Sequence, residues 1–201
     1  MNSEDLGPIK ELYHLWKPVY PYLTRQVEEV VGRREGDVLE VGPFCGAVFS
    51  LQAEGVGSSF SVAAFPTEMA AFFREETERL NLGHAVRVIE SDAALRGFDD
   101  NSIDLILFRG ALFFPSLFQV NFPAVQRVLR KGGVALVGGG FGKYTPQSVI
   151  ETIGRRSREL NLLAGKVEVS EAEILETIRS ESTSAKFEIL SEGGLWVIMR
   201  K

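Results

Sequence analysis

One stretch, residues 37–46, constrains the fold more than any other part of the chain. Val38, Leu39 and Val41 are typical of a short strand buried on both faces, and Gly42 marks the point where such a strand turns. Residues 47–53 contain neither glycine nor proline and are expected to continue as a helix. Strand, glycine loop and helix together open a nucleotide-binding βαβ unit, because the helix N-terminus presents free N–H groups and glycine lets a ligand approach the backbone.

The rest of the chain alternates strand and helix patterns. The further predicted strands are residues 58–65, 85–91, 103–108, 134–137, 186–190 and 195–199. Helical periodicity occupies the longer segments between them and also precedes the first strand. We therefore expect an α/β fold, a Rossmann-like three-layer sandwich whose seven-stranded, mostly parallel sheet has an antiparallel C-terminal hairpin at its edge.

Two helices carry capping signals. Asn121 can cap a helix with Pro123 in its first turn, or the helix begins at Ser116 and Pro123 kinks it. In either case residues 131–133, which include two glycines, are expected to end it. Further along, a serine and a glutamate at positions 170 and 173 predict a capping box.

The N-terminal segment is unusually aromatic. Residues 8–31 predict two short helices with a break at Pro18 and Pro21. Such a segment either packs on the edge of the sheet or forms a lid over a small-molecule pocket, for which aromatic walls are well suited. With 201 residues and 45% hydrophobic content, we expect residues 1–201 to form a single domain in which residues 1–35 are a helical lid or cap.

Composition excludes several classes of partner. The net charge is −5, and the basic cluster at residues 155–158 has acidic neighbours, so we interpret it as a solvated helix face and expect no nucleic-acid partner. A lone cysteine, Cys45, rules out an internal disulfide and a cysteine-based zinc site, and no metal is expected. The acidic start at residues 1–5, and the absence of any apolar run near ~18 residues, indicate a cytoplasmic chain with no membrane partner.

At this point the order of motifs resembles a family, the class I S-adenosylmethionine-dependent methyltransferases, in particular the small-molecule branch that has no separate substrate domain. The resemblance covers about residues 13–201. It rests on four fragments in order, residues 38–42, 90–93, 101–106 and 128–133.

The resemblance implies S-adenosylmethionine as the cofactor and gives the first motif a role. Glu40 would accept a hydrogen bond, directly or through water, from the cofactor ammonium. The backbone from Gly42 to Gly46, with Pro43 between them, would wrap the methionine portion. The family usually carries another glycine in the middle of this loop, where this sequence has Phe44. That ring is expected to narrow the cofactor channel.

Two further strand ends would hold the adenosine. Ala64 and Phe65 would lie beside the ribose. Asp92 would accept the adenine amino group, and the Ala93 N–H would face a ring nitrogen. The family usually ends the second strand with an acid that holds both ribose hydroxyls, and this sequence has alanine there, with Glu68 one helical turn further on as a candidate substitute.

Four residues, of which Arg109 also belongs to the cofactor-binding candidates, are expected to act in methyl transfer. Arg109 would lie beneath the sulfonium, where it would pair with the cofactor carboxylate or bind an acidic acceptor. Phe113 and Phe114 would point toward the acceptor, and Tyr20 belongs to the aromatic N-terminal segment. These four residues are the catalytic candidates, and the expected partner is a small-molecule substrate.

The motifs favour a methyltransferase that acts on an unidentified small molecule, mainly by proximity and orientation. The alternative is a non-catalytic protein of the same fold whose degenerate cofactor site serves a binding role, for which Phe44 and Ala64 argue. A nicotinamide oxidoreductase is the weakest interpretation, because the three-glycine fingerprint and the ribose acid are both missing.

Overall fold

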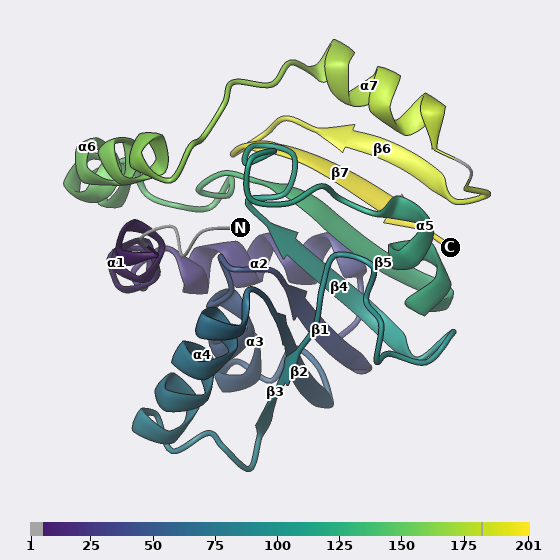
Figure 1. Ribbon diagram of the computed structural model, residues 1–201, viewed down its shortest axis with the longest axis horizontal. Helices are drawn as coiled ribbons and strands as arrows, with labels where there is room; N and C mark the ends of the chain where they lie inside the picture. The colour runs from purple at the N-terminus through teal and green to yellow at the C-terminus, as the bar shows by residue number, and fades with distance from the viewer. Residues whose placement is uncertain (1–5, 182) are drawn as a thin grey trace.

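Seven strands form one sheet in a computed structural model of the chain, which describes residues 6–181 and 183–201 (Figure 1). The strands are β1 Asp37–Val41, β2 Ser59–Ala64, β3 Val86–Glu90, β4 Ile103–Arg109, β5 Leu129–Gly139, β6 Lys186–Leu190 and β7 Leu195–Arg200. Their order is β3-β2-β1-β4-β5-β7-β6, and β7 runs antiparallel to both of its neighbours. The predicted mostly parallel sheet with an antiparallel C-terminal hairpin is confirmed. The acidic start at residues 1–5 lies outside the described residues.

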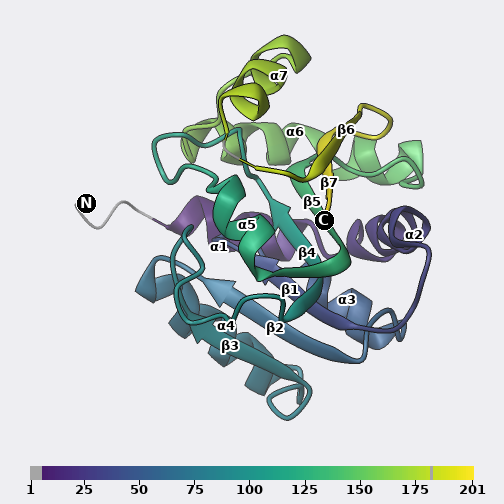
Figure 2. The same ribbon diagram turned by 90° about the vertical axis from the view of Figure 1, so that its right-hand side faces the viewer.

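Helices cover both faces of the sheet. They are α1 Gly7–Leu15, α2 Tyr20–Val31, α3 Ala47–Ala53, α4 Thr67–Arg79, α5 Phe122–Val128, α6 Gln147–Leu163 and α7 Glu171–Ser180. One apolar core joins the sheet to α1–α4 and α6, and a second joins it to α5 and α7. Figure 2 shows α5 in front of the strands and α3 and α4 behind them. The three-layer sandwich is therefore confirmed. Within the described part of the chain, no helix is long and apolar enough to cross a bilayer.

The capping signals identify the helix starts correctly. The Asn121 side chain accepts a hydrogen bond from the Ala124 N–H at 2.9 Å, so α5 begins after Asn121 with Pro123 in its first turn. The serine and glutamate at positions 170 and 173 form the expected capping box of α7.

The prediction for the end of α5 is wrong. The helix stops at Val128, and residues 129–133 already belong to β5. The pairing is long-range, because the Gly132 N–H donates to the Lys201 carbonyl and the Lys201 N–H donates to the Gly133 carbonyl. Pairing with Lys201 thus makes Gly132 and Gly133 part of β5, although these two glycines predict the end of a helix.

The first strand and the fourth are joined at their amino ends by Asp104. Its carboxylate accepts the Asp37 N–H at 2.9 Å and an Arg33 N–H at 3.1 Å, and it also pairs with Arg130. Gly36 passes so close that an added β-carbon would lie 2.7 Å from the Asp104 β-carbon. The Asp104 residue is only 9% exposed, whereas the Arg33 and Arg130 side chains are 43% and 40% exposed, so the carboxylate is buried and its two cations reach solvent.

The α1 and α4 helices are joined by Glu76. Its carboxylate accepts two hydrogen bonds from Arg79, at 2.8 and 2.5 Å, and lies 3.6 Å from the Lys17 ammonium. These hydrogen bonds, together with one from Tyr13 on α1, lower the pKa of Glu76 to about 2. The carboxylate therefore helps to position α1, the helix that lies beside α6 in Figure 1.

We predict that Asp104→Ala lowers the free energy of unfolding by about 2–4 kcal/mol, because it removes charge-assisted hydrogen bonds and leaves the Asp37 N–H without its acceptor. Urea unfolding followed by circular dichroism measures the loss. The control is Asp100→Ala, which removes a carboxylate whose side chain is 65% exposed and which pairs with Arg127. A surface pair of this kind contributes about 0–1 kcal/mol. Equal losses in the two variants would contradict the role given to Asp104.

We predict that the free energy of unfolding of Glu76→Gln changes less with pH at acidic pH than that of the wild type does. The pKa of Glu76 is lower in the folded state than its ordinary value of 4.5, so its contribution is complete above that value and is lost as the pH falls toward 2. At pH 7 the variant should be less stable by about 2 kcal/mol. This is less than the full pKa shift would imply, because Arg79 is half-exposed and solvent screens its interaction with Glu76. Urea unfolding between pH 7 and pH 2.5 tests this, with exposed Glu75→Gln as the control. Parallel profiles for wild type and Glu76→Gln would refute it.

Candidate functional site

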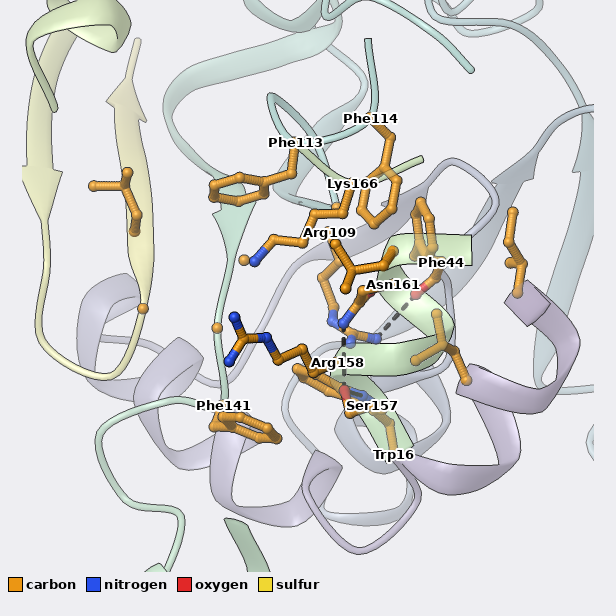
Figure 3. A pocket seen from close by; sticks show the side chains of 18 of the residues that line it. Trp16, Phe44, Arg109, Phe113, Phe114, Phe141, Ser157, Arg158, Asn161 and Lys166 are labelled. Atoms are coloured by element: carbon orange, nitrogen blue, oxygen red, sulfur yellow. Dashed lines mark hydrogen bonds between the residues drawn. The ribbon is translucent and has the colours of Figure 1, made fainter. Parts of the chain in front are cut away.

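A cavity of about 460 Å³ lies at the carboxyl edge of the sheet, beside the ends of β4 and β5 (Figure 3). Its walls come from α1, α6 and the loops that follow the two strands. Aromatic rings make up much of the wall, namely those of Tyr13, Trp16, Tyr20, Phe44, Phe113, Phe114 and Phe141. The four catalytic candidates, Tyr20, Arg109, Phe113 and Phe114, all line this cavity.

The N-terminal helices form one wall of the cavity. The Trp16 indole N–H donates to the Ser157 hydroxyl of α6 at 2.8 Å. The same indole stacks on Phe141, from the loop after β5, with ring centroids 4.8 Å apart and 7° between the planes. Trp16 thereby fastens the N-terminal segment to α6 and to the sheet edge. The segment lies where a lid would lie, and its movement as a lid stays a prediction.

A buried cation, Arg109, stands at the inner end of the cavity. The residue is 7% exposed, and its Nη1 donates to the Phe44 carbonyl at 2.9 Å. The Glu40 carboxylate lies 3.9 Å from the same nitrogen. The rings of Trp16 and Tyr20 each lie 4.9 Å from the guanidinium carbon, a geometry that stabilises a cation through the ring faces. The charge of Arg109 is therefore already balanced inside the chain.

The fully buried carboxylate of Glu40 caps α3. It accepts the N–H groups of Gly46 and Val48, both at 2.8 Å, and that of Ala47 at 3.3 Å. Burial raises the pKa of Glu40, while Arg109 and these N–H groups oppose the rise. The resemblance assigns Glu40 to the cofactor ammonium, and in this structure its oxygens serve the first turn of the helix. The carboxylate thus shapes the glycine loop from within.

Aromatic side chains occupy the space in which two glycines would otherwise carry a β-carbon. A β-carbon added at Gly46 would lie 2.6 Å from the Tyr20 hydroxyl oxygen, and one added at Gly110 would lie 2.4 Å from the Phe44 ring. The Phe44 ring in turn packs on Phe114, with centroids 4.3 Å apart. Phe44, the residue that departs from the family's glycine motif, thus forms the partition between the glycine loop and the cavity.

The residues predicted beside the adenosine lie outside the cavity lining. Asp92, at the carboxyl end of β3, accepts the Ala94 N–H at 2.9 Å and pairs with Arg96 at 2.5 Å. Burial acts to raise the pKa of Asp92, but the hydrogen bonds from Arg96 and Ala94 outweigh it and leave the pKa below its usual range. The neighbouring Ser91 hydroxyl is buried and has no hydrogen-bond partner among the described residues. Ala64 is fully buried, and its carbonyl accepts the Ser91 N–H.

A second aromatic cluster covers the sheet edge near β2. Phe65 packs edge-on against Phe118 and Phe108, with centroids 5.5 and 6.2 Å away, and the last two rings stack at 5.3 Å. A β-carbon added at Gly42 would lie 3.0 Å from Phe108. This cluster lies over the strand end that would face the ribose. Cofactor-side and acceptor-side candidates therefore lie in two adjacent places, with the glycine loop between them.

Sequence reasoning missed the contribution of α6 to the cavity. Gly154, Ser157, Arg158 and Asn161 line it from this helix, and Lys166 lines it from the segment that follows. Arg155, Arg156 and Arg158 are all exposed, as expected of a solvated face, and Arg158 in addition lines the cavity. The signal was present in the spacing, because small and polar residues recur three or four positions apart along one helix face.

Comparisons with known proteins agree with this fold. A family model for a methyltransferase domain matches residues 39–137. A protein of Methanococcus maripaludis, assigned as an S-adenosyl-L-methionine-dependent methyltransferase, is 22% identical, with 100% of this chain and 95% of that chain covered and a TM-score of 0.79. A SAM-dependent methyltransferase of Aquifex aeolicus is 18% identical, with 95% and 96% covered and a TM-score of 0.63.

A third solved structure contains ligands. Geranyl diphosphate C-methyltransferase of Streptomyces coelicolor, in complex with Mg²⁺, geranyl-S-thiolodiphosphate and S-adenosyl-L-homocysteine, is 12% identical over 88% of this chain and 73% of that chain, with a TM-score of 0.59. Among curated proteins, a hybrid PKS-NRPS synthetase of Penicillium oxalicum is 28% identical over 123 residues, which are 58% of this chain and 3% of that synthetase. The chain therefore spans a very small part of that relative. The chain therefore has the fold of the class I S-adenosylmethionine-dependent methyltransferases, and residues 39–137 are similar to the methyltransferase-domain family.

Proposed function

We propose that this chain is an S-adenosylmethionine-dependent methyltransferase whose acceptor is a small molecule bound in the cavity. The observation that carries the proposal is the convergence of Tyr20, Arg109, Phe113 and Phe114 on one cavity beside the glycine loop of a methyltransferase fold. Solved neighbours of the same fold that hold S-adenosyl-L-homocysteine support it. We also propose that the chain acts as one domain, with the N-terminal helices as the lid.

The adenosine end of the expected cofactor position fits such a group. The buried Ser91 hydroxyl without a partner stands at the carboxyl end of β3, directly before Asp92. A buried hydroxyl that makes no hydrogen bond is costly, and a ligand with polar ring edges would supply what is missing. We assign Asp92 and Ala93 to the adenine, and Ala64 and Phe65 to the ribose.

At the methionine end of the expected cofactor position, the glycine loop would supply backbone groups that contact the cofactor. We assign the segment from Gly42 through Pro43 to Gly46 to this part of the cofactor, and Glu40 to holding the loop by capping α3. The Phe44 ring rests on Gly110 between this loop and the cavity, so an acceptor reaches the loop only when the ring turns away.

The bound cofactor would supply an electrophilic methyl group. The chain's part is to exclude water with its aromatic wall and to hold the acceptor in one orientation, the main sources of rate when a reagent is already activated. Burial raises the pKa of Tyr20 to about 12, against the opposing effect of Arg109. The Tyr20 hydroxyl therefore stays protonated near neutral pH.

A non-catalytic binding protein is the second candidate. It is favoured by the Phe44 ring against Gly110 and by the fully buried Ala64 where an acid usually stands. In that case the cavity keeps a ligand while the cofactor position has closed. Direct measurement of cofactor binding separates the two candidates before any acceptor is known.

We predict that the wild type binds S-adenosylmethionine and S-adenosylhomocysteine, and that Asp92→Asn weakens both by about 10-fold to 100-fold, the effect of losing one charge-assisted hydrogen bond. Asparagine keeps an oxygen for the Ala94 N–H, so the turn and the melting temperature should be preserved. Isothermal titration calorimetry measures the affinities. The control is Asp99→Asn, an exposed position in the following turn. Unchanged affinity in Asp92→Asn would remove this residue from the site.

We predict that Phe44→Gly tightens cofactor binding several-fold, because the ring no longer has to leave Gly110, at some cost in stability from lost aromatic packing and a more flexible loop. The same calorimetric titration, with a melting curve for each protein, measures both effects. If neither the wild type nor Phe44→Gly gives heat with either cofactor form, the methyltransferase proposal fails and the binding protein remains.

A further inference from the structure

We propose that the ligand of the cavity is a small organic anion with an apolar body, and that Arg158 and Lys166 hold its anionic group. The inference rests on the proposed function only in naming this ligand as the methyl acceptor. Binding itself is independent of the cofactor and can be measured without it.

Two cations reach the cavity from different elements. Arg158 is an exposed residue of α6 that lines the cavity, and Lys166, from the segment after that helix, is partly buried. Figure 3 shows both charged ends directed into the same region of the cavity, between Phe113 and Phe141. The Lys166 ammonium lies 5.5 Å from the centre of the Phe113 ring. An anionic group placed between these two side chains would meet both.

These two charges lack the compensation that Arg109 has. No ion pair joins Arg158 or Lys166 to any residue for which the structure gives coordinates that can be described, whereas Arg109 has Glu40 at 3.9 Å and the Phe44 carbonyl at 2.9 Å. Glu168 is the acidic residue of the lining, and it is exposed, as is Arg158. A chain with a net charge of −5 thus carries more positive than negative charge along the lining of its cavity. Such a field attracts small anions selectively.

The wall formed by Phe44 and Phe114 determines the apolar part of the ligand. Phe44 and Phe114, which pack on each other, line the end of the cavity that meets the glycine loop. A volume of about 460 Å³ suits a small molecule with one ring system or a short chain. The anionic group at Arg158 and Lys166 would leave the apolar end against Phe44. The position to be methylated then belongs to the apolar end of the ligand, away from its charge.

Carboxylate and phosphate groups share this chemistry, so the test uses both. The probes are trans-cinnamate and phenyl phosphate, and cinnamamide is the uncharged match to cinnamate. Binding is followed by calorimetry and by the fluorescence of Trp16, which lines the cavity, against the background of the fully buried Trp196. The variants are Arg158→Gln, Lys166→Gln and the double variant. The matched control is Arg155→Gln, which removes the same charge from an equally exposed position of the same helix that does not line the cavity.

We expect both single variants to weaken binding of the anions about tenfold and the double variant to weaken it further, in line with charge-assisted hydrogen bonds. Cinnamamide should bind the wild type at least about tenfold more weakly than cinnamate, and Arg155→Gln should match the wild type. The ratio of cinnamate to phenyl phosphate affinity then tells which anionic group is preferred.

Three results would overturn the inference: equal binding of cinnamate and cinnamamide, an Arg155→Gln effect as large as that of Arg158→Gln, or no binding of either anion. Failure of the proposed function gives a different pattern. Anion binding that depends on Arg158 and Lys166, in a protein that gives no heat with S-adenosylmethionine, would leave the anion site standing and remove the methyltransferase. Cofactor binding without anion binding would do the reverse.

Discussion

The buried carboxylate of Glu40 joins the parts on which the site depends. It starts on β1, accepts the first N–H groups of α3, and faces Arg109 at the end of β4. A carboxylate in this position satisfies N–H groups that the helix itself leaves free, and it complements the positive end of the helix dipole. The guanidinium across from it prevents an isolated buried charge. Removing either partner would leave the other buried charge without its counter-charge.

Arg109 transmits this arrangement to the cavity. Its hydrogen bond to the Phe44 carbonyl holds the middle of the glycine loop against the end of β4. The rings of Trp16 and Tyr20 lie against the same guanidinium, so the N-terminal helices are positioned by the same charge. The glycine loop, the N-terminal helices and the sheet edge thus all contact Arg109, and these contacts determine the shape of the cavity.

Most of the fold was predictable from local patterns. The apolar runs of the strands, the cap at Asn121 and the capping box of α7 each depend on residues close together in the sequence. The start of β5 at Leu129 was not predictable, because Gly132 and Gly133 pair with Lys201 at the far end of the chain.

The candidate site was predictable only in part, for the same reason. Motif order brought Arg109, Phe113 and Phe114 to one strand end, where the structure also has them. Which atoms occupy the space above a glycine depends on rings from distant segments, as with Tyr20 at Gly46. That Arg158 lines the cavity depends on how α6 is rotated against α1, and residue type alone carries no information about that rotation.

The hydrogen bond between Trp16 and Ser157 spans 141 positions of the sequence. The cavity is therefore built from segments far apart in the sequence, and it exists only after the five strands between α1 and α6 have formed and brought those segments together. A ligand that fills it binds the assembled state alone, so occupancy stabilises the attachment of α1 to α6 by mass action. In this chain, ligand binding in the cavity and the attachment of α1 to α6 are therefore thermodynamically linked.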